Sequence, residues 1–343
     1  MNPGAAETEY DRIMKGIRPE RLLRLRRISA KTVVLYNQRV AEFLSWASAQ
    51  QVMVGSSERR LDINMSKYFN ELYEDGEAYN VASYTLFGFI ALKMSPKRPE
   101  KDLLPLARSA LNAWKASTPC ASRVGVPPQV IYRFACFCLE SGERDAAAAV
   151  LIQYDLYLRP SEILQLKRRD IVKPVANVSQ RWGVLIGNSD FEEVSKTGTT
   201  DDIVVANSAH RTWCNDLVRH VAFRFLDQDV CLFGITLNHY EKLFREFTKV
   251  YKLTPQCFTP HTIRHSGPSF DALHEHRSLG EIQARGRWAS ATSVRRYRKP
   301  GRLLMHASRL PAGLKRFRQQ DLDSALRTII GRRWVLSAPT PAE

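Results

Sequence analysis

The stretch RGRWASATSVRRYRKP, residues 285–300, combines a lone phenol with six cations and no acid. Tyr297 lies nine positions after Trp288, and the cations are Arg285, Arg287, Arg295, Arg296, Arg298 and Lys299. A phenol can act as a nucleophile that forms a covalent intermediate, although its ordinary pKa of about 10 keeps it mostly protonated. Neighbouring cations favour the phenolate and attract phosphate groups. The stretch is therefore either a site where a phenol attacks a polyanion or a solvated basic surface over a packed ring.

The segment LYLRPSEILQL places another cation at a bend in the chain. Arg159 follows an apolar run and precedes Pro160, which favours a break between two helices. Ser161 can cap the second helix, and Glu162 falls in its first turn. An arginine at such a bend either points into a cleft or lies on the surface, and this segment alone does not decide between the two.

The segment HTIRHSG brings two further reactive groups together. His261 and Arg264 are three positions apart and are neighbours on one helical face, whereas His265 is expected to point elsewhere. A guanidinium can bind two oxygens of a phosphate at once, in a bidentate arrangement, and an imidazole can donate or accept a proton near neutral pH. Lys196, in the connector VSKTGTT, is the candidate lysine, and Lys173 is the alternative. A capped helix start with a satisfied histidine explains HTIRHSG equally well by itself.

Taken in order, these groups resemble the catalytic set of the tyrosine recombinases, also called the phage integrase family. LYLRPSEILQLKRRDI resembles the first arginine box of that family, and HTIRHS resembles the second. GRW, with Tyr297 nine positions after the tryptophan, resembles the last box. The resemblance covers about residues 120–305, and it departs from the commoner pattern at GPSFDAL and at RGRW, which replaces a leucine-glycine-histidine.

The resemblance implies how the phosphodiester is held and attacked. Tyr297 attacks the phosphorus and becomes a 3′-phosphotyrosine, while Arg159 and Arg264 hold the two non-bridging oxygens. In this resemblance, Glu162 orients one of the cations and does not itself contact the phosphate. Because the covalent link conserves the energy of the broken bond, neither a cofactor nor a metal is expected.

The resemblance also implies the groups that move protons. His261 supports the arginines and is the candidate acceptor of the tyrosine proton. Lys196 protonates the 5′ oxygen as it leaves. Trp288 donates its indole N–H to a phosphate oxygen and packs against the tyrosine helix.

The overall charge agrees with a nucleic-acid partner. The chain has 51 basic and 35 acidic residues, a net charge of +16 that attracts a polyanion. The resemblance implies double-stranded DNA as the partner and a homotetramer when two duplexes are joined. The residues expected to contact the DNA backbone are Arg24, Arg26, Arg27, Lys31, Arg287, Arg295, Arg296 and Arg298.

Two domains are expected to position these groups. Residues 1–17 are predicted to be a flexible N-terminus, 18–116 a helical core-binding domain, 117–128 a linker and 129–343 the catalytic domain. Helical periodicity in the first domain predicts a helix over 30–47, with Ser29 as its cap. Three more helices are predicted in LDINMSKYFNELYEDG, NVASYTLFGFIALKM and LLPLARSALNAWKAS. The segment STPCASRVGVPP loses the helical period and collects turn formers, as linkers do.

The predicted fold class is mainly α with a small antiparallel β-sheet. SEILQLKRRDI is predicted to be an amphipathic helix, and RWGVLIG and DDIVVAN are predicted strands on either side of VSKTGTT. The segment AGLKRFRQQDLDSALRTIIGRRW is predicted to be a C-terminal helix that contacts a neighbouring protomer or packs on its own domain. Its apolar stripe consists of Leu314, Phe317, Leu322, Leu326 and Ile329.

Several classes of protein fit the sequence poorly. A run of about 18 apolar residues and a secretory start are both missing, so no membrane partner is expected. The six cysteines form no CxxC pair, which disfavours zinc and, with the other features, predicts an intracellular protein, nuclear in a eukaryote and in the cytoplasm or nucleoid of a prokaryote. The leading interpretation is a site-specific recombinase that integrates, excises or transposes a mobile element. The alternatives are a topoisomerase-like DNA-relaxing enzyme and a non-catalytic DNA-binding protein descended from a recombinase.

Overall fold

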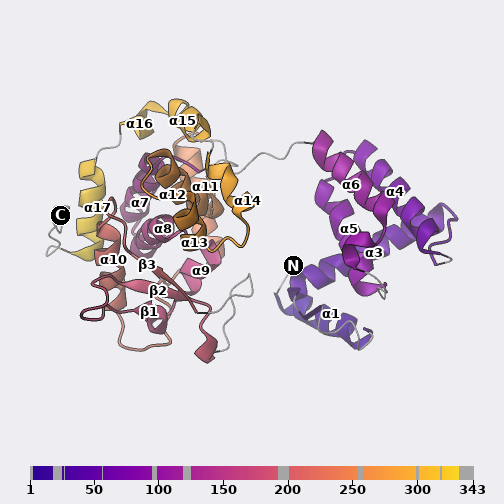
Figure 1. Ribbon diagram of the computed structural model, residues 1–343, viewed down its shortest axis with the longest axis horizontal. Helices are drawn as coiled ribbons and strands as arrows, with labels where there is room; N and C mark the ends of the chain where they lie inside the picture. Colours follow the sequence, from indigo (N-terminus) through magenta and orange to yellow (C-terminus); the bar gives the residue numbers. More distant parts are fainter. Residues whose placement is uncertain are drawn as a thin grey trace. The chain divides into compact units, whose positions relative to one another are not determined.

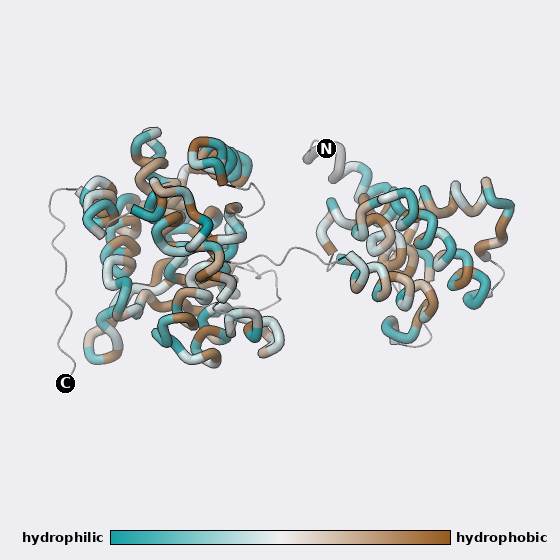
Figure 2. The backbone as a smooth tube through the Cα atoms, turned by 90° about the horizontal axis from the view of Figure 1, so that it is seen from above, coloured by the Kyte–Doolittle hydropathy of each residue, from teal (hydrophilic) through white to brown (hydrophobic). Residues whose placement is uncertain are grey.

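The chain of the computed structural model divides into two units, residues 1–121 and 122–343, and the division falls within the predicted linker. The structure describes residues 3–17, 25–26, 28–55, 57–94, 99–118, 125–191, 201–253, 258–298, 301–316 and 319–331. Within these ranges, no helix is both long enough and apolar enough to span a lipid bilayer. Each unit has its own apolar interior, which Figure 2 shows as brown segments inside and teal segments on the outer turns.

The N-terminal unit is helical (Figure 1). Its helices are α1 (Pro3–Lys15), α3 (Ala30–Ala49), α4 (Glu58–Glu74), α5 (Tyr79–Leu92) and α6 (Pro105–Ser117). Ser29 caps α3 as predicted, because its hydroxyl accepts the Thr32 N–H at 3.3 Å. The buried carboxylate of Asp62, on α4, accepts the N–H groups of Leu106 and Ala107 at 3.0 and 2.9 Å. It therefore satisfies the start of α6, which its own N-cap does not.

Helix α1 corrects the prediction of a flexible N-terminus. Tyr10, Ile13, Met14 and Ile17 recur at helical spacing and pack against a small cluster that includes buried Val33 of α3. The stripe is short and follows a polar start, so the composition of residues 1–17 concealed it. Burial of this stripe is the physical reason that the segment is ordered as a helix.

The second unit has helices around a small sheet. Its helices are α7 (Pro128–Glu140), α8 (Arg144–Leu156), α9 (Pro160–Gln165), α10 (Trp213–Ala222), α11 (Leu237–Val250), α12 (Pro260–Leu273), α13 (Leu279–Arg285), α14 (Ala291–Val294), α15 (Gly301–Ser308), α16 (Ala312–Lys315) and α17 (Gln319–Ile330). A 3₁₀ turn, Arg295–Arg298, follows α14 directly. The strands are β1 (Ile171–Val172), β2 (Gly183–Ile186) and β3 (Asp202–Val205), in the spatial order β1-β2-β3.

The sheet is antiparallel throughout, which confirms the predicted fold class. Strand β2 pairs Gly183 with Val205 and Ile186 with Asp202, as the hairpin prediction requires. The predicted helix SEILQLKRRDI is wrong in its second half, because α9 ends at Gln165. The carbonyl of Leu166 instead accepts the N–H of Leu232 at 2.9 Å, and the chain turns into β1. A partner 66 positions further along the chain overrode the local pattern.

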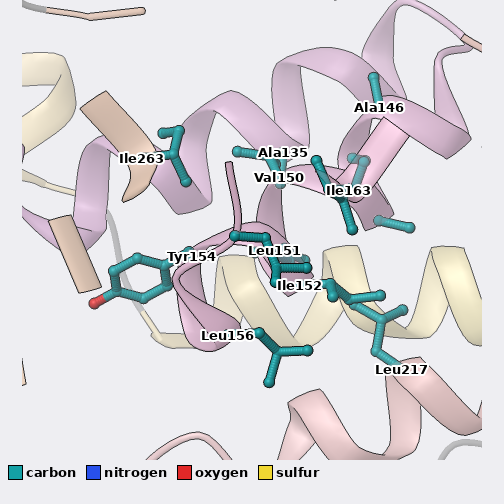
Figure 3. Packing of buried hydrophobic residues seen from close by; sticks show 14 of the residues in the cluster. Ala135, Ala146, Val150, Leu151, Ile152, Tyr154, Leu156, Ile163, Leu217 and Ile263 are labelled. Carbon is teal, nitrogen blue, oxygen red and sulfur yellow. The ribbon is translucent and has the colours of Figure 1, made fainter. Parts of the chain in front are cut away.

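Helix α8 is the centre of the second unit. All its residues from Ala146 to Leu156 are buried, and Figure 3 shows Val150, Leu151 and Ile152 among side chains from neighbouring elements. Helices α7, α10 and α12 pack against it. An apolar helix surrounded on all sides is a rigid base from which the following residues can be positioned.

Helix α17 packs on its own unit through buried Leu322, Leu326 and Ile329, beside α7 and α10 (Figure 1). This is one of the two arrangements that the sequence left open. Phe317 lies outside the described residues. Contact with a neighbouring protomer is not tested by a single chain and stays a prediction.

Candidate active site

The C-terminal end of α8 begins the candidate site. Tyr157 ends this helix with a φ of 55°, a left-handed conformation that is uncommon for a bulky residue. Its hydroxyl donates a hydrogen bond to Asp271, and its carbonyl accepts one from Nη1 of Arg264 at 2.6 Å. Arg159 follows two residues later and provides the N-cap of α9, where its N–H donates to Glu162 Oε2 at 2.7 Å. This turn therefore places Arg159 next to Arg264.

Three guanidinium groups surround the carboxylate of Glu162. Nη1 of Arg159 lies 2.5 Å from Oε1, and Nη1 of Arg264 lies 3.5 Å from Oε2. Nη2 of Arg287 donates to the same Oε2. Arg159 lies at the start of α9 and Arg264 in α12, and the two predicted arginines meet at one carboxylate. Arg287 was predicted to be an outer DNA contact, but its side chain is only 5% exposed and belongs to this cluster.

Burial and charge act in opposite directions on the ionisation of this cluster. Burial alone would raise the pKa of Glu162, but Arg287 and the other cations, together with the Arg159 N–H, hold it below its ordinary value. Burial lowers the pKa of Arg264 to about 10, with Glu162 opposing the shift and Arg159 and Arg287 adding to it. Burial also lowers the pKa of Arg287. Glu162, Arg264 and Arg287 are therefore charged at neutral pH, although burial disfavours the charged form of each.

The phenol of Tyr297 lies beside the arginine cluster and is bonded to His265. Its oxygen is 2.8 Å from Nδ1 of His265, and the side chain is 4% exposed. The expectation that His265 points elsewhere is wrong. His265 is four positions after His261 and shares the helical face of α12 with it, and an i, i+4 spacing places both on the same side. His261 is exposed in the first turn of that helix.

Trp288 forms one wall of the tyrosine site. Its ring centroid lies 5.3 Å from that of Tyr297, and the guanidinium of Arg264 lies over it at 5.0 Å. Nη2 of Arg264 also donates to the carbonyl of Gly286 at 2.6 Å. A Cβ on Gly286 would lie 1.8 Å from the indole ring, so only glycine allows Trp288 to fold back over the turn. The glycine, the indole and the arginine therefore form one packed unit.

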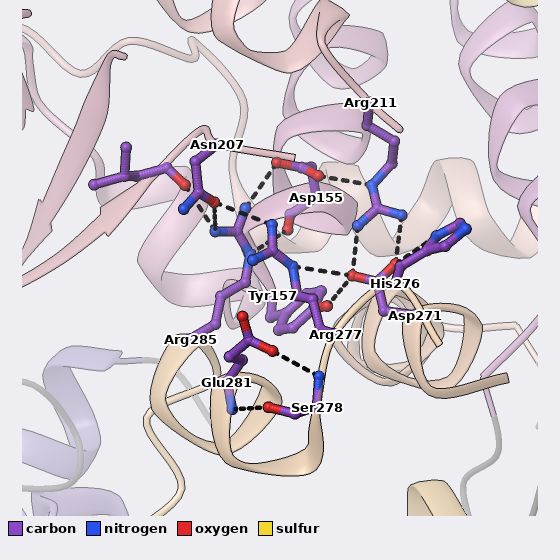
Figure 4. Close-up of polar contacts among 11 residues, drawn as sticks. Asp155, Tyr157, Asn207, Arg211, Asp271, His276, Arg277, Ser278, Glu281 and Arg285 are labelled. Carbon is purple, nitrogen blue, oxygen red and sulfur yellow. Dashed lines mark hydrogen bonds and ion pairs between the residues drawn. The ribbon is translucent and has the colours of Figure 1, made fainter. Parts of the chain in front are cut away.

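A buried ion network behind the site connects α8, α12 and α13 through Arg211, which precedes α10 (Figure 4). Arg211 donates to Asp155 Oδ1 at 2.6 Å and makes two bonds of 2.7 Å to the carboxylate of Asp271. Arg285 donates to Asp155 Oδ2 at 2.8 Å and to the carbonyl of Val205 at 2.7 Å. Burial raises the pKa of Asp271, but its bonds to Arg211 outweigh this and leave the pKa lowered. Arg285, one of the cations of the opening stretch, therefore has a structural partner.

The other predicted residues are exposed or lie outside the described residues. Lys173 is exposed after β1, Arg295 is exposed after α14, and Arg26 and Lys31 are exposed in the N-terminal unit. Residues outside the described ranges are Lys196, Arg24 and Arg27, and the side chains of Arg296 and Arg298. The structure therefore brings together Arg159, Glu162, Arg264, Trp288 and Tyr297 of the predicted set.

The sequence contained signals for the residues that its interpretation missed. Asp155 is the one charged residue in the run AAAAVLIQYDLYL, and a lone charge in a mostly apolar run predicts a buried ion pair. Asp271 occurs in GPSFDAL, the segment that departs from the commoner family pattern. The partner of both, Arg211, had no local signal, because it lies more than 50 positions from either of them.

Comparison with known proteins supports the fold. No protein-family model matches the sequence, and no curated protein matches it. Among solved structures, the chain is similar to the XerH site-specific recombinase bound to palindromic difH substrate in a post-cleavage complex, with a TM-score of 0.53 and 17% identity. The match covers 82% of this chain and 79% of that one. The Tn1549 transposon integrase in complex with circular intermediate DNA matches with a TM-score of 0.47 and 17% identity, over 80% of this chain and 98% of that one. At 17% identity, the match to the XerH recombinase confirms the tyrosine-recombinase resemblance at the level of the fold.

Proposed function

We propose that this protein is a site-specific DNA recombinase that cleaves one strand of duplex DNA through Tyr297. The observation that supports this most directly is the meeting of Arg159 and Arg264 at Glu162, with Tyr297 and Trp288 packed beside them. Two neighbouring guanidinium groups match the two non-bridging oxygens of a phosphodiester. A fold shared with a recombinase supports the same reading.

The proposed cleavage step balances as follows. The phenolic oxygen of Tyr297 forms a bond to phosphorus, and the bond from phosphorus to the 5′ oxygen breaks. His265, which already contacts the phenol at 2.8 Å, accepts the phenolic proton in place of the predicted His261. Lys196 gives a proton to the departing 5′ oxygen, and Lys173 is the alternative donor. Arg159 and Arg264 stabilise the charge that develops on the non-bridging oxygens.

Glu162 has a supporting role in this proposal. It lies between the arginines and bonds to the N–H and the guanidinium of Arg159, so it holds them without touching the phosphate. The covalent intermediate conserves the bond energy. Rejoining by a 5′ hydroxyl from another duplex then completes recombination without a cofactor.

The test is capture of the covalent intermediate. A duplex with a nick close to the cleavage position loses its short 5′-hydroxyl fragment after cleavage, so the protein–DNA adduct accumulates and migrates as a protease-sensitive band on a denaturing gel. Because the target sequence is unknown, the substrate is a library of random duplexes, and adduct-bound molecules are sequenced. The wild-type chain is expected to form the adduct, and Tyr297→Phe is expected to form none while it unfolds at a similar temperature. Wild-type protein that leaves no adduct on any member of the library would refute the proposal.

We extend the proposal to the partner and the assembly. Double-stranded DNA is the partner, supported by the net charge of +16, and a homotetramer joins two duplexes. The biological outcome is integration, excision or transposition of a mobile element. Sedimentation of the protein with and without the captured duplex tests the assembly, and a complex that never exceeds one protomer per duplex would contradict it.

A further inference from the structure

Arg287 occupies a backbone conformation that its side chain makes unfavourable. Its φ is 53°, in the left-handed region where glycine is favoured over residues with a Cβ. The residue is at the turn between α13 and Trp288, and its N–H bonds to the carbonyl of Ala284 at 3.0 Å. Residues in strained backbone conformations cluster at functional sites, because they persist only where the surrounding structure compensates for the strain.

The guanidinium of Arg287 is only partly satisfied. Its Nη2 bonds to Glu162, but its Nε and Nη1 are buried and have no hydrogen-bond partner among the described residues. Buried donors of a charged group are normally paired, and leaving them unpaired is unfavourable. The side chain is 5% exposed, so bulk water does not readily replace the missing acceptors.

The charge of the cluster points to the chemistry of the missing acceptor. Arg159, Arg264 and Arg287 contact one carboxylate, Glu162, so three positive charges meet one negative charge. Asp202, at the start of β3, also favours the charged form of Arg287, but it forms no ion pair with it among the described residues. Two donors on Arg287 and the excess positive charge together fit a group with several anionic oxygens, such as a phosphate.

We infer that Arg287 is a third catalytic arginine, which binds a non-bridging oxygen of the scissile phosphate through one of its two unpaired donors, Nε or Nη1. This rests on the proposed function, because the phosphate in question is the one that Tyr297 attacks. Glu162 holds Arg287 through Nη2 and so fixes the guanidinium while Nε and Nη1 stay unpaired. Arg287 adds to the stabilisation of the charge that develops as phosphorus becomes five-coordinate.

The test compares Arg287→Gly with the wild type on nicked duplexes of the captured sequence. Glycine suits the left-handed backbone, so the variant removes the guanidinium without adding strain, and its thermal unfolding midpoint is expected to equal or exceed that of the wild type. Single-turnover adduct formation is expected to fall by about 10²–10³-fold, as when one oxyanion donor is removed from an enzyme. A substrate with a methylphosphonate at the cleavage position lacks one non-bridging oxygen and its charge. On one of its two stereoisomers the difference between variant and wild type is expected to disappear.

Glu275→Gly is the matched control. Glu275 has a φ of 56°, is exposed after α12 and lies outside the cluster, so the change should leave adduct formation unaltered on both substrates. Equal rates for Arg287→Gly and wild type on the ordinary phosphodiester overturn the inference. An equal loss on phosphodiester and on both methylphosphonates also overturns it, because that result indicates a structural role.

If the wild-type protein forms no adduct, the proposed function is refuted, but the binding of an anion at Arg287 can still be measured. The readout is then the rise in thermal unfolding midpoint with added inorganic sulfate, which binding to the folded state produces. A rise that is larger for wild type than for Arg287→Gly supports the anion site. An identical rise in both proteins refutes it.

Discussion

Gly267, in the middle of α12, is the position where the structure predicts the clearest effect of one added atom. A Cβ there would lie 2.3 Å from the carbonyl oxygen of Tyr154 and 2.6 Å from the ring of Tyr157. Both neighbours are completely buried, and the oxygen belongs to the backbone, so neither can rotate away. Gly267→Ala therefore forces α8 and α12 apart by a distance on the order of 1 Å.

Two opposing effects determine the change in stability. Replacing glycine by alanine in a helix interior stabilises the helix by about 1 kcal/mol. Overpacking a core costs about 1–3 kcal/mol, and the rigid neighbours here place Gly267→Ala at the upper end of that range. The expected net loss in the free energy of unfolding is about 2 kcal/mol, which lowers the unfolding midpoint of a unit this size by about 4–8 °C.

The same displacement should also slow adduct formation. Helix α12 carries Arg264 and His265, which contact Tyr157 and Tyr297 at 2.6 and 2.8 Å. A misplacement on the order of 1 Å can reduce a rate by about 10²-fold. Adduct formation is measured well below the unfolding midpoint of the variant, so that loss of folded protein does not contribute.

Gly280→Ala is the control for helix propensity alone. Gly280 lies in α13, is exposed and has its nearest neighbour, the Ser278 hydroxyl, at 4.0 Å. It is expected to be neutral or slightly stabilising and to leave the adduct rate unchanged. If Gly267→Ala proves as stable and as fast as Gly280→Ala, the close contact between α8 and α12 is not real and the reasoning fails.

Four further outcomes follow from the contacts described. Asp271→Asn leaves Arg211 buried without its full charge partner and should cost about 3–5 kcal/mol in urea unfolding; a loss near zero would contradict the network. Glu162 has a folded-state pKa below its ordinary value of 4.5, so its stabilisation is complete above that pH and is lost as the pH falls through the lowered value. The stability difference between wild type and Glu162→Gln should therefore shrink on acidification. A difference that stays constant argues against a lowered pKa of Glu162 in the folded state. His265→Ala should slow adduct formation by about 10²-fold, whereas an unchanged rate excludes His265 as the proton acceptor. Ser29→Ala should destabilise the N-terminal unit by about 1 kcal/mol, and hydrogen exchange at the start of α3 that does not change would contradict the cap.

Features that depend on nearby residues were predictable from the sequence. The period of apolar residues and the caps predicted α3 to α6, and Asp202–Val205 and Gly183–Ile186 were recognised as strands by their β-branched residues. The order of Arg159, Arg264, Trp288 and Tyr297 predicted one set of site residues, and the structure brings these four together. Each of them sits at a helix start or a turn, where the nearby sequence indicates its surroundings.

The features that were missed depend on distant partners. The end of α9 is set by Leu232, and the role of Asp155 is set by Arg211, and neither partner is close in sequence. His265 differs from these cases, because its i, i+4 relation to His261 within α12 is visible in the sequence itself. Arg287 appeared to be one cation among six, and only its φ and its burial distinguish it from Arg295.

The shielding of Tyr297 has a consequence for how often such a protein would damage DNA by accident. A side chain that is 96% covered by its own chain, as 4% exposure means, cannot reach a passing phosphate during a brief random encounter. Reaction then requires the covering groups to shift while the duplex stays bound. Residence time on DNA, rather than the frequency of collision, would select which sites are cut.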